Sequence, residues 1–194
     1  MVLGGLVLAG GQGLRMGGQN KGLIPFRNGD LIDPMLALLK AECAYVAVSA
    51  NQDIQRYQQK QVDVWFDVAP WKNCGPLGGV YSSCLQFPAE VDLIQVLPCD
   101  SPFISKQVLQ TLFNALTSKH LNAVYAKTST QIYPVIFLFK RDLLPHLNHF
   151  LSTEKKHSIR RWLSQVHAEA VLFEDESYFV NMNDIKTLES YRVK

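Results

Sequence analysis

Two cations and a run of glycines stand together near the start of the chain. The stretch LAGGQGLRMGGQNKG, from Leu8 to Gly22, holds six glycines and the charged residues Arg15 and Lys21. Glycines have no Cβ, so their backbone can approach a pyrophosphate closely and direct successive amide N–H groups at its oxygens. Arg15 is suited to fork-like contact with phosphate oxygens, and Lys21 to act as a point charge. The stretch therefore indicates a phosphate-binding loop, with a turn carrying two solvated basic residues as the alternative.

The spacing excludes two common phosphate loops. A dinucleotide-binding GxGxxG would start at Gly11 and Gly13, but its third glycine position is Met16. A Walker A loop needs glycine directly before the lysine, and Asn20 precedes Lys21. Neither pattern fits, so a phosphate-binding role for this loop would place it in another class of phosphate loop.

Three polar residues follow apolar, strand-like runs further along the chain. Asn51 ends YVAVSAN, Asp67 ends VDVWFD, and Asp100 comes just after DLIQVLPC. A single well-placed carboxylate such as Asp100 can hold Mg²⁺ together with substrate phosphates, and an amide such as Asn51 can both donate and accept hydrogen bonds. Asp and Asn also fill ordinary turn and cap positions, which is the alternative for all three.

The elements that must position these residues alternate between strand-like and helix-like patterns. The run GLVLA precedes the glycine loop as a buried strand would, and helical patterns separate it from the three later strands. This alternation predicts βαβ units, a mainly parallel sheet and ligands beyond the carboxyl ends of its strands. We expect the glycine loop, Asn51, Asp67 and Asp100 to meet at one sheet edge. The other expected elements are helices at 32–43, 53–61, 80–87, 105–120, 141–151 and 158–166, a loop at 69–79, strands at 122–127, 133–139 and 168–174, and a last short helix after Asp184.

Length and composition fit one soluble domain spanning residues 1–194. Apolar types make up 47% of the residues, charged types 19%, and the net charge of +2 is too weak to indicate a nucleic acid or an anionic membrane as partner. No signal peptide or membrane-spanning run is recognisable. The four cysteines form no CxxC pair, which favours a reducing, cytoplasmic setting.

The histidines and serines indicate neither zinc nor covalent hydrolysis. The only close histidine pair, His146 and His149, has no cysteine or carboxylate companion nearby, so we expect no zinc site. No GxSxG elbow is present, which argues against an α/β-hydrolase type of enzyme.

The glycine stretch resembles the signature LAGGxxxRMGGxDKG of the molybdenum cofactor guanylyltransferases, the MobA type of nucleotidyltransferase. Four further stretches, VSAN, FDVAPWKNCGPLGG, LPCDSPF and FVNMNDIKTLE, are similar to motifs of the same family and occur in the same order. One position departs: Asn20 stands where the family usually has Asp. The substitution either removes a negative charge and any metal ligation at this position, or is harmless because the side chain only braces the loop.

The resemblance implies a Rossmann-like three-layer α/β/α fold and transfer of GMP from GTP to molybdopterin, with Mg²⁺ as cofactor and release of pyrophosphate. Proteins that supply and accept the cofactor would be transient partners. The same resemblance implies the site. Catalytic residues would be Arg15, Lys21 and Asp100, with Asp100 holding the metal; the nucleotide would be bound by Leu8, Ala9, Gly10, Gly11, Lys21, Asn51, Asp67 and Asp100; and the second substrate would meet Gly78, Gly79, Asn181 and Asn183.

Several alternatives remain open from the residues alone. The GPLGG stretch from Gly75 to Gly79 can equally start a helix, and the two C-terminal asparagines can equally cap one. A basic cluster can attract an anionic pterin phosphate or form a solvated face; it comprises Lys155, Lys156, His157, Arg160 and Arg161. The rival functions are a related nucleotidyltransferase that uses CTP or another phosphorylated acceptor, and a catalytically weak nucleotide-binding protein.

Overall fold

The computed structural model describes residues 1–10, 20–72, 74–183 and 185–192. Within these ranges, a seven-stranded sheet has the order β5-β4-β1-β6-β8-β7-β9. Neighbouring strands are parallel except at β8, which is antiparallel to both β6 and β7. The strands are β1 (Val2–Leu8), β4 (Tyr45–Ser49), β5 (Asp63–Trp65), β6 (Val91–Pro98), β7 (Ala123–Lys127), β8 (Ile132–Lys140) and β9 (Glu169–Leu172).

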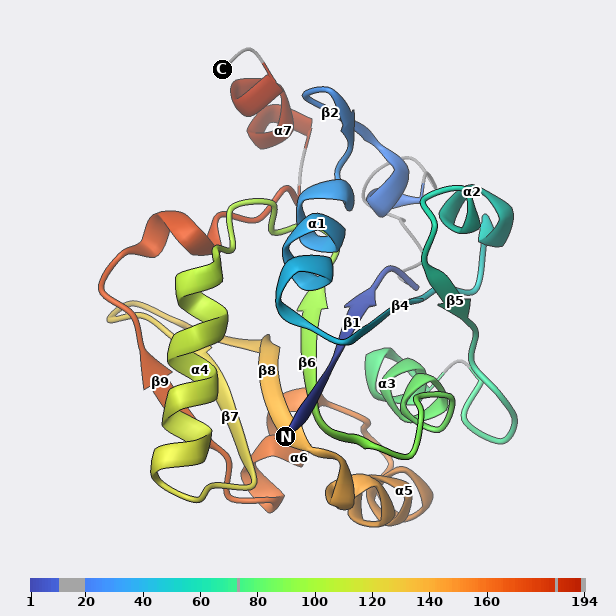
Figure 1. The fold of residues 1–194 in the computed structure, drawn as a ribbon, viewed down its shortest axis with the longest axis vertical. Coiled ribbons are helices and arrows are strands. Elements are labelled where there is room, and N and C mark those ends of the chain that lie inside the picture. The colour runs from blue at the N-terminus through green and yellow to red at the C-terminus, as the bar shows by residue number, and fades with distance from the viewer. Residues whose placement is uncertain (11–19, 73, 184, 193–194) are drawn as a thin grey trace.

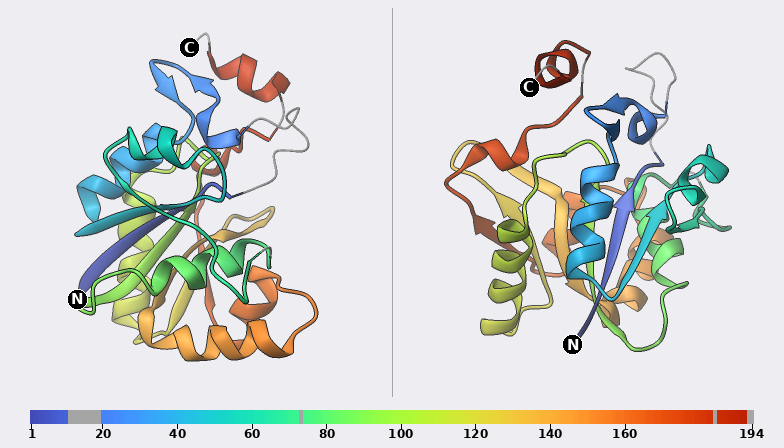
Figure 2. Two further views of the ribbon diagram at one scale, coloured as in Figure 1. Left: turned by 90° about the vertical axis from the view of Figure 1, so that its right-hand side faces the viewer. Right: turned by 45° about the horizontal axis from the view of Figure 1, so that its top comes forward.

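Helices cover both faces of this sheet (Figures 1 and 2). The apolar side chains of α1, α2 and α4 belong to one core cluster, and those of α3, α5 and α6 to another, so the sheet separates two helical layers. The expected Rossmann-like α/β/α fold is confirmed. The helices of these layers are α1 (Asp33–Glu42), α2 (Ile54–Gln58), α3 (Pro76–Cys84), α4 (Lys106–Ser118), α5 (Leu144–Thr153) and α6 (Ile159–Gln165).

A smaller third cluster lies beyond the carboxyl edge of the sheet. The short hairpin of β2 (Pro25–Phe26) and β3 (Gly29–Asp30) packs near helix α7 (Ile185–Arg192), as the top of Figure 1 shows. The buried side chains of this cluster are Ile24, Phe26, Leu31, Met182 and Leu188. The C-terminal segment is therefore held against the part of the chain that follows the glycine-rich stretch.

The central parallel strands end in register, which brings distant residues to one edge. Leu8 pairs with Ser49 of β4 and with Pro98 of β6. Beyond the strands, the Ala9 amide donates to the Ser49 carbonyl at 2.9 Å, and the Cys99 amide donates to the Leu8 carbonyl at 3.1 Å. As predicted, the chain therefore delivers the residues after β1, β4 and β6 to a common edge, where open α/β sheets bind their ligands.

Several predicted boundaries differ from the structure, and three of these elements flank the sheet edge described above. The strand expected to end at Asp67 ends at Trp65, so Asp67 lies in the following loop. The helix expected over 53–61 spans only Ile54–Gln58, and the helix expected from residue 80 begins at Pro76. Proline is favoured in the first helical turn, and Gly75 before it has a φ of 72°, which glycine adopts without strain. The predicted loop 69–79 is therefore wrong for its last four residues, and the alternative that the Gly75–Gly79 stretch starts a helix is confirmed.

Among the described residues, no helix has both the length and the apolar character that crossing a bilayer requires.

Candidate functional site

A cavity of about 340 Å³ opens at the carboxyl edge of β1, β4 and β5. Six of the predicted site residues line it, from the ends of the strands and from the start of α3: Leu8, Ala9, Gly10, Asn51, Asp67 and Gly79. The sequence indicated Gly75 and Pro76 only as part of the GPLGG stretch and did not single out Ser49 and Gln52, and Asn20 completes the lining. The predicted residues Gly11 and Arg15 lie outside the described residues.

Asn51 and Asp67 form a closed pair at the cavity wall. The Asn51 Nδ2 donates to Asp67 Oδ2 at 3.0 Å, and the Asp67 backbone N donates to Asn51 Oδ1 at 2.9 Å. Asp67 is buried, whereas Asn51 is exposed toward the cavity side. The pair gives the cavity a carboxylate whose orientation is fixed by an amide from the neighbouring strand.

The first turn of α3 approaches the same wall because Gly79 has no side chain. A Cβ on Gly79 would lie 2.5 Å from Ser49 Oγ and 3.2 Å from Asp67 Oδ1. Gly78 faces elsewhere, since a Cβ there would lie 2.5 Å from the Trp71 carbonyl oxygen. Of the two predicted glycines, only Gly79 therefore lines the cavity, and Gly78 permits the loop before α3 to pack.

A second polar centre joins three of the predicted residues. The Lys21 ammonium forms an ion pair with Asp100 Oδ2 and donates a hydrogen bond to Asn183 Oδ1. The backbone of Asp100 is fixed as well, because the Met182 amide donates to its carbonyl oxygen at 2.8 Å. The arrangement ties the residue after β6 to both the glycine-rich stretch and the C-terminal segment.

The remaining carboxylate oxygen of Asp100 is a candidate ligand for a cation. Asp100 Oδ1 is buried and has no hydrogen-bond partner among the described residues. Those residues contain no group of three or more His, Cys, Asp or Glu side chains that would hold a metal unaided. An oxygen-preferring cation such as Mg²⁺ is commonly held by one or two carboxylates plus substrate phosphates, so this single carboxylate fits such an ion.

Asn181 and Asn183 line a second cavity of about 480 Å³ beside this centre. Asn183 reaches Lys21, and Asn181 Oδ1 is buried without a hydrogen-bond partner among the described residues. The other lining residues are Gln131, Tyr133, Glu176, Ser177, Phe179 and Val180. The two asparagines thus connect a second polar cavity to the Lys21–Asp100 ion pair.

The Cys99 thiol, next to Asp100, is unreactive at neutral pH. Burial, and then the nearby Asp100 charge, raise the pKa of Cys99 to about 12. The thiol therefore stays protonated at neutral pH and is no candidate nucleophile, because the thiolate is the reactive form.

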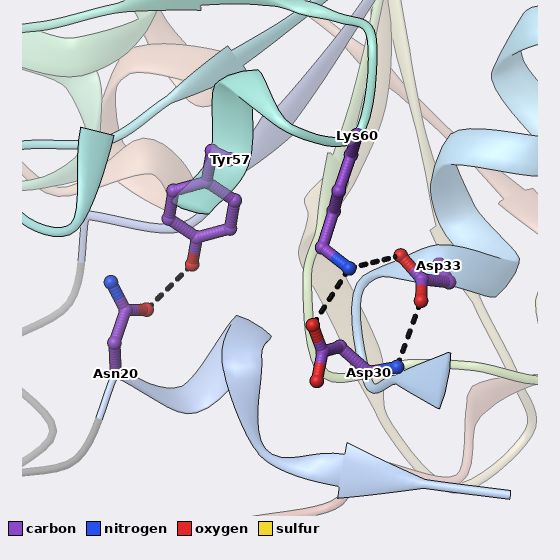
Figure 3. A network of polar contacts seen from close by, with 5 residues as sticks. All are labelled: Asn20, Asp30, Asp33, Tyr57 and Lys60. Atoms are coloured by element: carbon purple, nitrogen blue, oxygen red, sulfur yellow. Dashed lines mark hydrogen bonds and ion pairs between the residues drawn. The ribbon is translucent and has the colours of Figure 1, made fainter. Parts of the chain in front are cut away.

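Asn20 is held by two side chains that the sequence did not single out. The Tyr57 hydroxyl donates to Asn20 Oδ1 at 2.6 Å, and Asn20 Nδ2 donates to Asp53 Oδ2 at 3.2 Å. Figure 3 shows the Tyr57 hydroxyl directed at the Asn20 amide. The only sequence signal for Tyr57 is that it is the one aromatic residue in the polar stretch DIQRYQQKQ.

The basic cluster from Lys155 to Arg161 lies at the connection between α5 and α6. Its lysines and arginines are exposed, and Arg161 forms an ion pair of 2.8 Å with Glu154. None of the cluster lines either cavity described above. The geometry therefore favours the solvated-face alternative.

Comparisons with known proteins agree with the motif resemblance. The model of the MobA-like NTP transferase domain matches residues 5–170. A molybdenum cofactor guanylyltransferase of Pasteurella multocida is 33% identical over 187 residues, covering 95% of this chain and 96% of that protein. A putative molybdenum cofactor guanylyltransferase of Neisseria meningitidis serogroup B is 29% identical over 181 residues, covering 92% and 93%.

Solved structures share the fold at low sequence identity. Molybdopterin-guanine dinucleotide biosynthesis protein A from Archaeoglobus fulgidus aligns with a TM-score of 0.79 and 16% identity, covering 98% of this chain and 97% of that one. Rv0371C from Mycobacterium tuberculosis, solved in complex with manganese, aligns with a TM-score of 0.70 and 14% identity, with both chains fully covered.

The family match spans the glycine-rich stretch, Asn51, Asp67 and Asp100, and the full-length relatives extend it over nearly the whole chain. The expectation from the motifs is therefore confirmed, and the chain belongs to the family of MobA-like NTP transferase domains, which are nucleotidyltransferases.

Proposed function

We propose that this protein transfers GMP from GTP to the terminal phosphate of a molybdopterin-type cofactor, forming the guanine dinucleotide cofactor and releasing pyrophosphate. One observation carries the proposal: a cavity of nucleoside-binding chemistry adjoins the Lys21–Asp100–Asn183 centre in a chain that matches molybdenum cofactor guanylyltransferases over more than nine-tenths of its length. The cavity would bind the nucleotide, and the polar centre would hold the metal ion and face the phosphates and the second substrate.

The nucleotide would lie between the end of β1 and the Asn51–Asp67 pair. The backbone of Leu8, Ala9, Gly10 and Gly11 would approach it closely, and the fixed Asn51 and Asp67 groups would face its nucleoside. Lys21 and Arg15 would neutralise the phosphates, because charge accumulates on the leaving pyrophosphate during transfer. An oxygen of the acceptor phosphate attacks the α-phosphorus of GTP, and the bond from that phosphorus to the bridging oxygen breaks with its electron pair. The acceptor is already anionic, so no strong general base is needed.

Asp100 is the residue we propose for Mg²⁺. Its buried Oδ1, which has no partner among the described residues, and the phosphate oxygens of GTP are the hard ligands that this ion prefers. The bound ion would polarise the phosphoryl oxygens and neutralise developing charge. The manganese reported for the M. tuberculosis neighbour supports a divalent cation in this fold.

The second substrate would approach from the side of Asn181 and Asn183. Asn183 already meets Lys21, and Gly79 adds no side chain of its own to the cavity wall beside Asp67. We assign Gly78 to packing behind that wall. We propose that residues 1–194 act as one domain in the cytoplasm, with transient contacts to proteins that supply and accept the cofactor and with neither nucleic acid nor membrane as partner.

Pyrophosphate release, measured separately with GTP, CTP and ATP in the presence of Mg²⁺ and a molybdopterin source, tests the proposal. We expect release with GTP only when the acceptor is present, and a larger rise in melting temperature with GTP than with the other nucleotides, because a ligand that binds only the folded state stabilises it. Preference for CTP would identify the cytidylyl alternative. Binding of GTP without any release would identify a nucleotide-binding protein instead.

A further inference from the structure

The Asn20 side chain is used at both of its polar atoms. Its Oδ1 accepts from the Tyr57 hydroxyl and its Nδ2 donates to the Asp53 carboxylate. An amide is the side chain that can accept at one atom and donate at the other without carrying charge. A carboxylate at position 20 would satisfy Tyr57 but would face Asp53 with a second negative charge.

Tyr57 is built into the core as the support for this contact. Its ring is buried among the side chains under α1 and α2, and burial is the largest cause that raises the pKa of its hydroxyl, followed by the nearby Cys99 and Asp53. The hydroxyl therefore stays protonated and remains a donor. A Cβ on Gly22 would lie 2.6 Å from this hydroxyl oxygen, so the backbone just after Lys21 runs directly against Tyr57.

The segment around α2 also contacts the chain about ten residues beyond Lys21, at Asp30 and Asp33. The Lys60 ammonium lies 2.7 Å from Asp30 Oδ2 and 2.7 Å from Asp33 Oδ1, and the other Asp33 oxygen accepts from the Asp30 amide at 2.8 Å. Figure 3 shows both sets of contacts side by side, Tyr57 with Asn20 and Lys60 with the two aspartates. Residues 53–60 therefore bind segment 20–33 at both of its ends, through Asn20 at one end and through Asp30 and Asp33 at the other; we call this set of contacts the clamp.

These contacts connect the two halves of the proposed site. Asn20 directly precedes Lys21, whose ammonium meets Asp100, and Asp53 is two residues beyond Asn51, which is paired with Asp67. We propose that Asn20, Asp53 and Tyr57 are a set of positioning residues that fixes Lys21 relative to the Asn51–Asp67 pair, and that the 20–53 contact tolerates only one carboxylate. The inference rests on the proposed function for the nucleotide, GTP, and for turnover, but not for the acceptor.

The requirement predicts a specific pattern in a double-mutant cycle. Asn20→Asp alone places two carboxylates across a contact of hydrogen-bond length, and like charges at such a distance cannot both be accommodated without a displacement or a proton. The double variant Asn20→Asp with Asp53→Asn again has one amide and one carboxylate, with the carboxylate at position 20 and the amide at position 53. Asn is also well tolerated at position 53, where φ is 52° and the backbone is left-handed. Residues in contact show such non-additivity, whereas independent residues do not.

The experiment measures GTP binding by calorimetry in Mg²⁺ and, separately, kcat and KM for the full chain and its variants. We expect Asn20→Asp to weaken GTP binding and raise the KM for GTP about tenfold, the double variant to return within about threefold of wild type, and Asp53→Asn alone to have a small effect. The GTP affinity of Tyr57→Phe should lie between those of wild type and Asn20→Asp, because this variant loses the hydroxyl donor and keeps the ring. The matched controls are Asn28→Asp and Asp63→Asn, the same chemical changes at exposed positions, which should leave binding unchanged.

Three outcomes would overturn the inference. Equal defects in Asn20→Asp and in the double variant would show that no exchange across the 20–53 contact occurs. A wild-type affinity in Asn20→Asp would show that the amide is not required. The test is independent of the acceptor: if the wild type binds GTP but transfers nothing to molybdopterin, the proposed function fails and the pattern of affinities still decides the inference. A loss of melting temperature shared by all variants, without the rescue pattern, would also contradict it and mark a role in folding alone.

Discussion

The Lys21 ammonium occupies one carboxylate oxygen of Asp100 while the other oxygen, Oδ1, is buried and unpaired among the described residues. Lys21 is thus the internal counter-ion of the group that we propose for the metal. Only about a fifth of the Lys21 side chain and an eighth of the Asp100 side chain are exposed, at 20% and 13%, so the pair is shielded from bulk water. A cation arriving at Asp100 meets a carboxylate whose charge is already partly balanced.

Removing Lys21 should therefore separate metal binding from turnover. In Lys21→Met, Asp100 loses its counter-ion, so Mn²⁺ should bind the nucleotide-free protein several-fold more tightly. Transfer should fall by about a hundredfold or more, because a cation facing the phosphates is lost. Electron paramagnetic resonance of free Mn²⁺ and the pyrophosphate assay measure the two effects, with the exposed Lys155→Met as control. Unchanged metal affinity would mean that Lys21 and the cation do not share this carboxylate.

Replacing Asp100 tests the same centre from the other side. Asp100→Asn keeps the size and the backbone hydrogen bond from Met182, and deletes the charge, so the fold should survive. Transfer should fall by orders of magnitude while GTP binding without metal changes little, since the β1 backbone and Asn51 are untouched. A near-wild-type rate with the usual dependence on Mg²⁺ would move the metal to another carboxylate, with Asp67 the next candidate.

The two glycines of α3 should respond differently to the same substitution. Gly79→Ala places a methyl group against Ser49 Oγ, which can rotate, and narrows the cavity beside Asp67, so GTP affinity should drop while melting temperature changes little. Gly78→Ala places its methyl group against the Trp71 carbonyl, which belongs to the backbone and must shift. We expect that variant to lose about 1–3 kcal/mol of stability, beyond any gain in helix propensity. Thermal unfolding measures the stability of the two variants, and calorimetry measures their affinity for GTP. Equal changes of both quantities in Gly78→Ala and Gly79→Ala would contradict the assignment of Gly79 to the cavity and of Gly78 to packing.

The strands and the edge at which they end could be predicted from local pattern. Apolar β-branched runs before polar loop residues indicated β1, β4 and β6, and the register of parallel strands then brings Ala9, Asn51 and Asp100 together without further information. Boundaries were less predictable where turn chemistry and helix propensity compete: Pro76 begins a helix inside a stretch whose glycines indicated a loop.

The side-chain pairings could not be predicted, because they depend on how elements pack. Asn20 and Asp53 are separated by 33 residues, and nothing in their spacing indicates that α2 returns to the end of the glycine-rich stretch. The same holds for the pairing of Asn51 with Asp67 and of Lys21 with Asn183, which lie 16 and 162 residues apart. Motifs indicated which residues matter, and the tertiary structure determines what each of them holds.

Lys60 offers a test of the clamp that leaves the proposed catalytic groups intact. Burial alone would lower the pKa of Lys60, but hydrogen bonds to Asp30 and Asp33 and the charges of both raise it above its ordinary value. A lysine whose folded pKa lies above the unfolded value of about 10.4 contributes its full stabilisation below that pH, and loses it as pH rises through the folded pKa. Lys60→Met should therefore cost about 1 kcal/mol between about pH 7 and 9, and less above about pH 10.5.

Urea unfolding of wild type and Lys60→Met at these pH values measures the difference, with Lys156→Met, exposed on the α5–α6 connection, as the control for loss of one positive charge. Because Lys60 fixes Asp30 and Asp33 while Tyr57 fixes Asn20, loosening the Lys60 end should raise the KM for GTP less than Asn20→Asp does. The ion pairs of Lys60 hold the end of the stretch that is farther from Lys21 along the chain. A stability difference that stays constant through pH 11, or a KM defect in Lys60→Met larger than that of Asn20→Asp, would contradict this assignment of the two ends of the clamp.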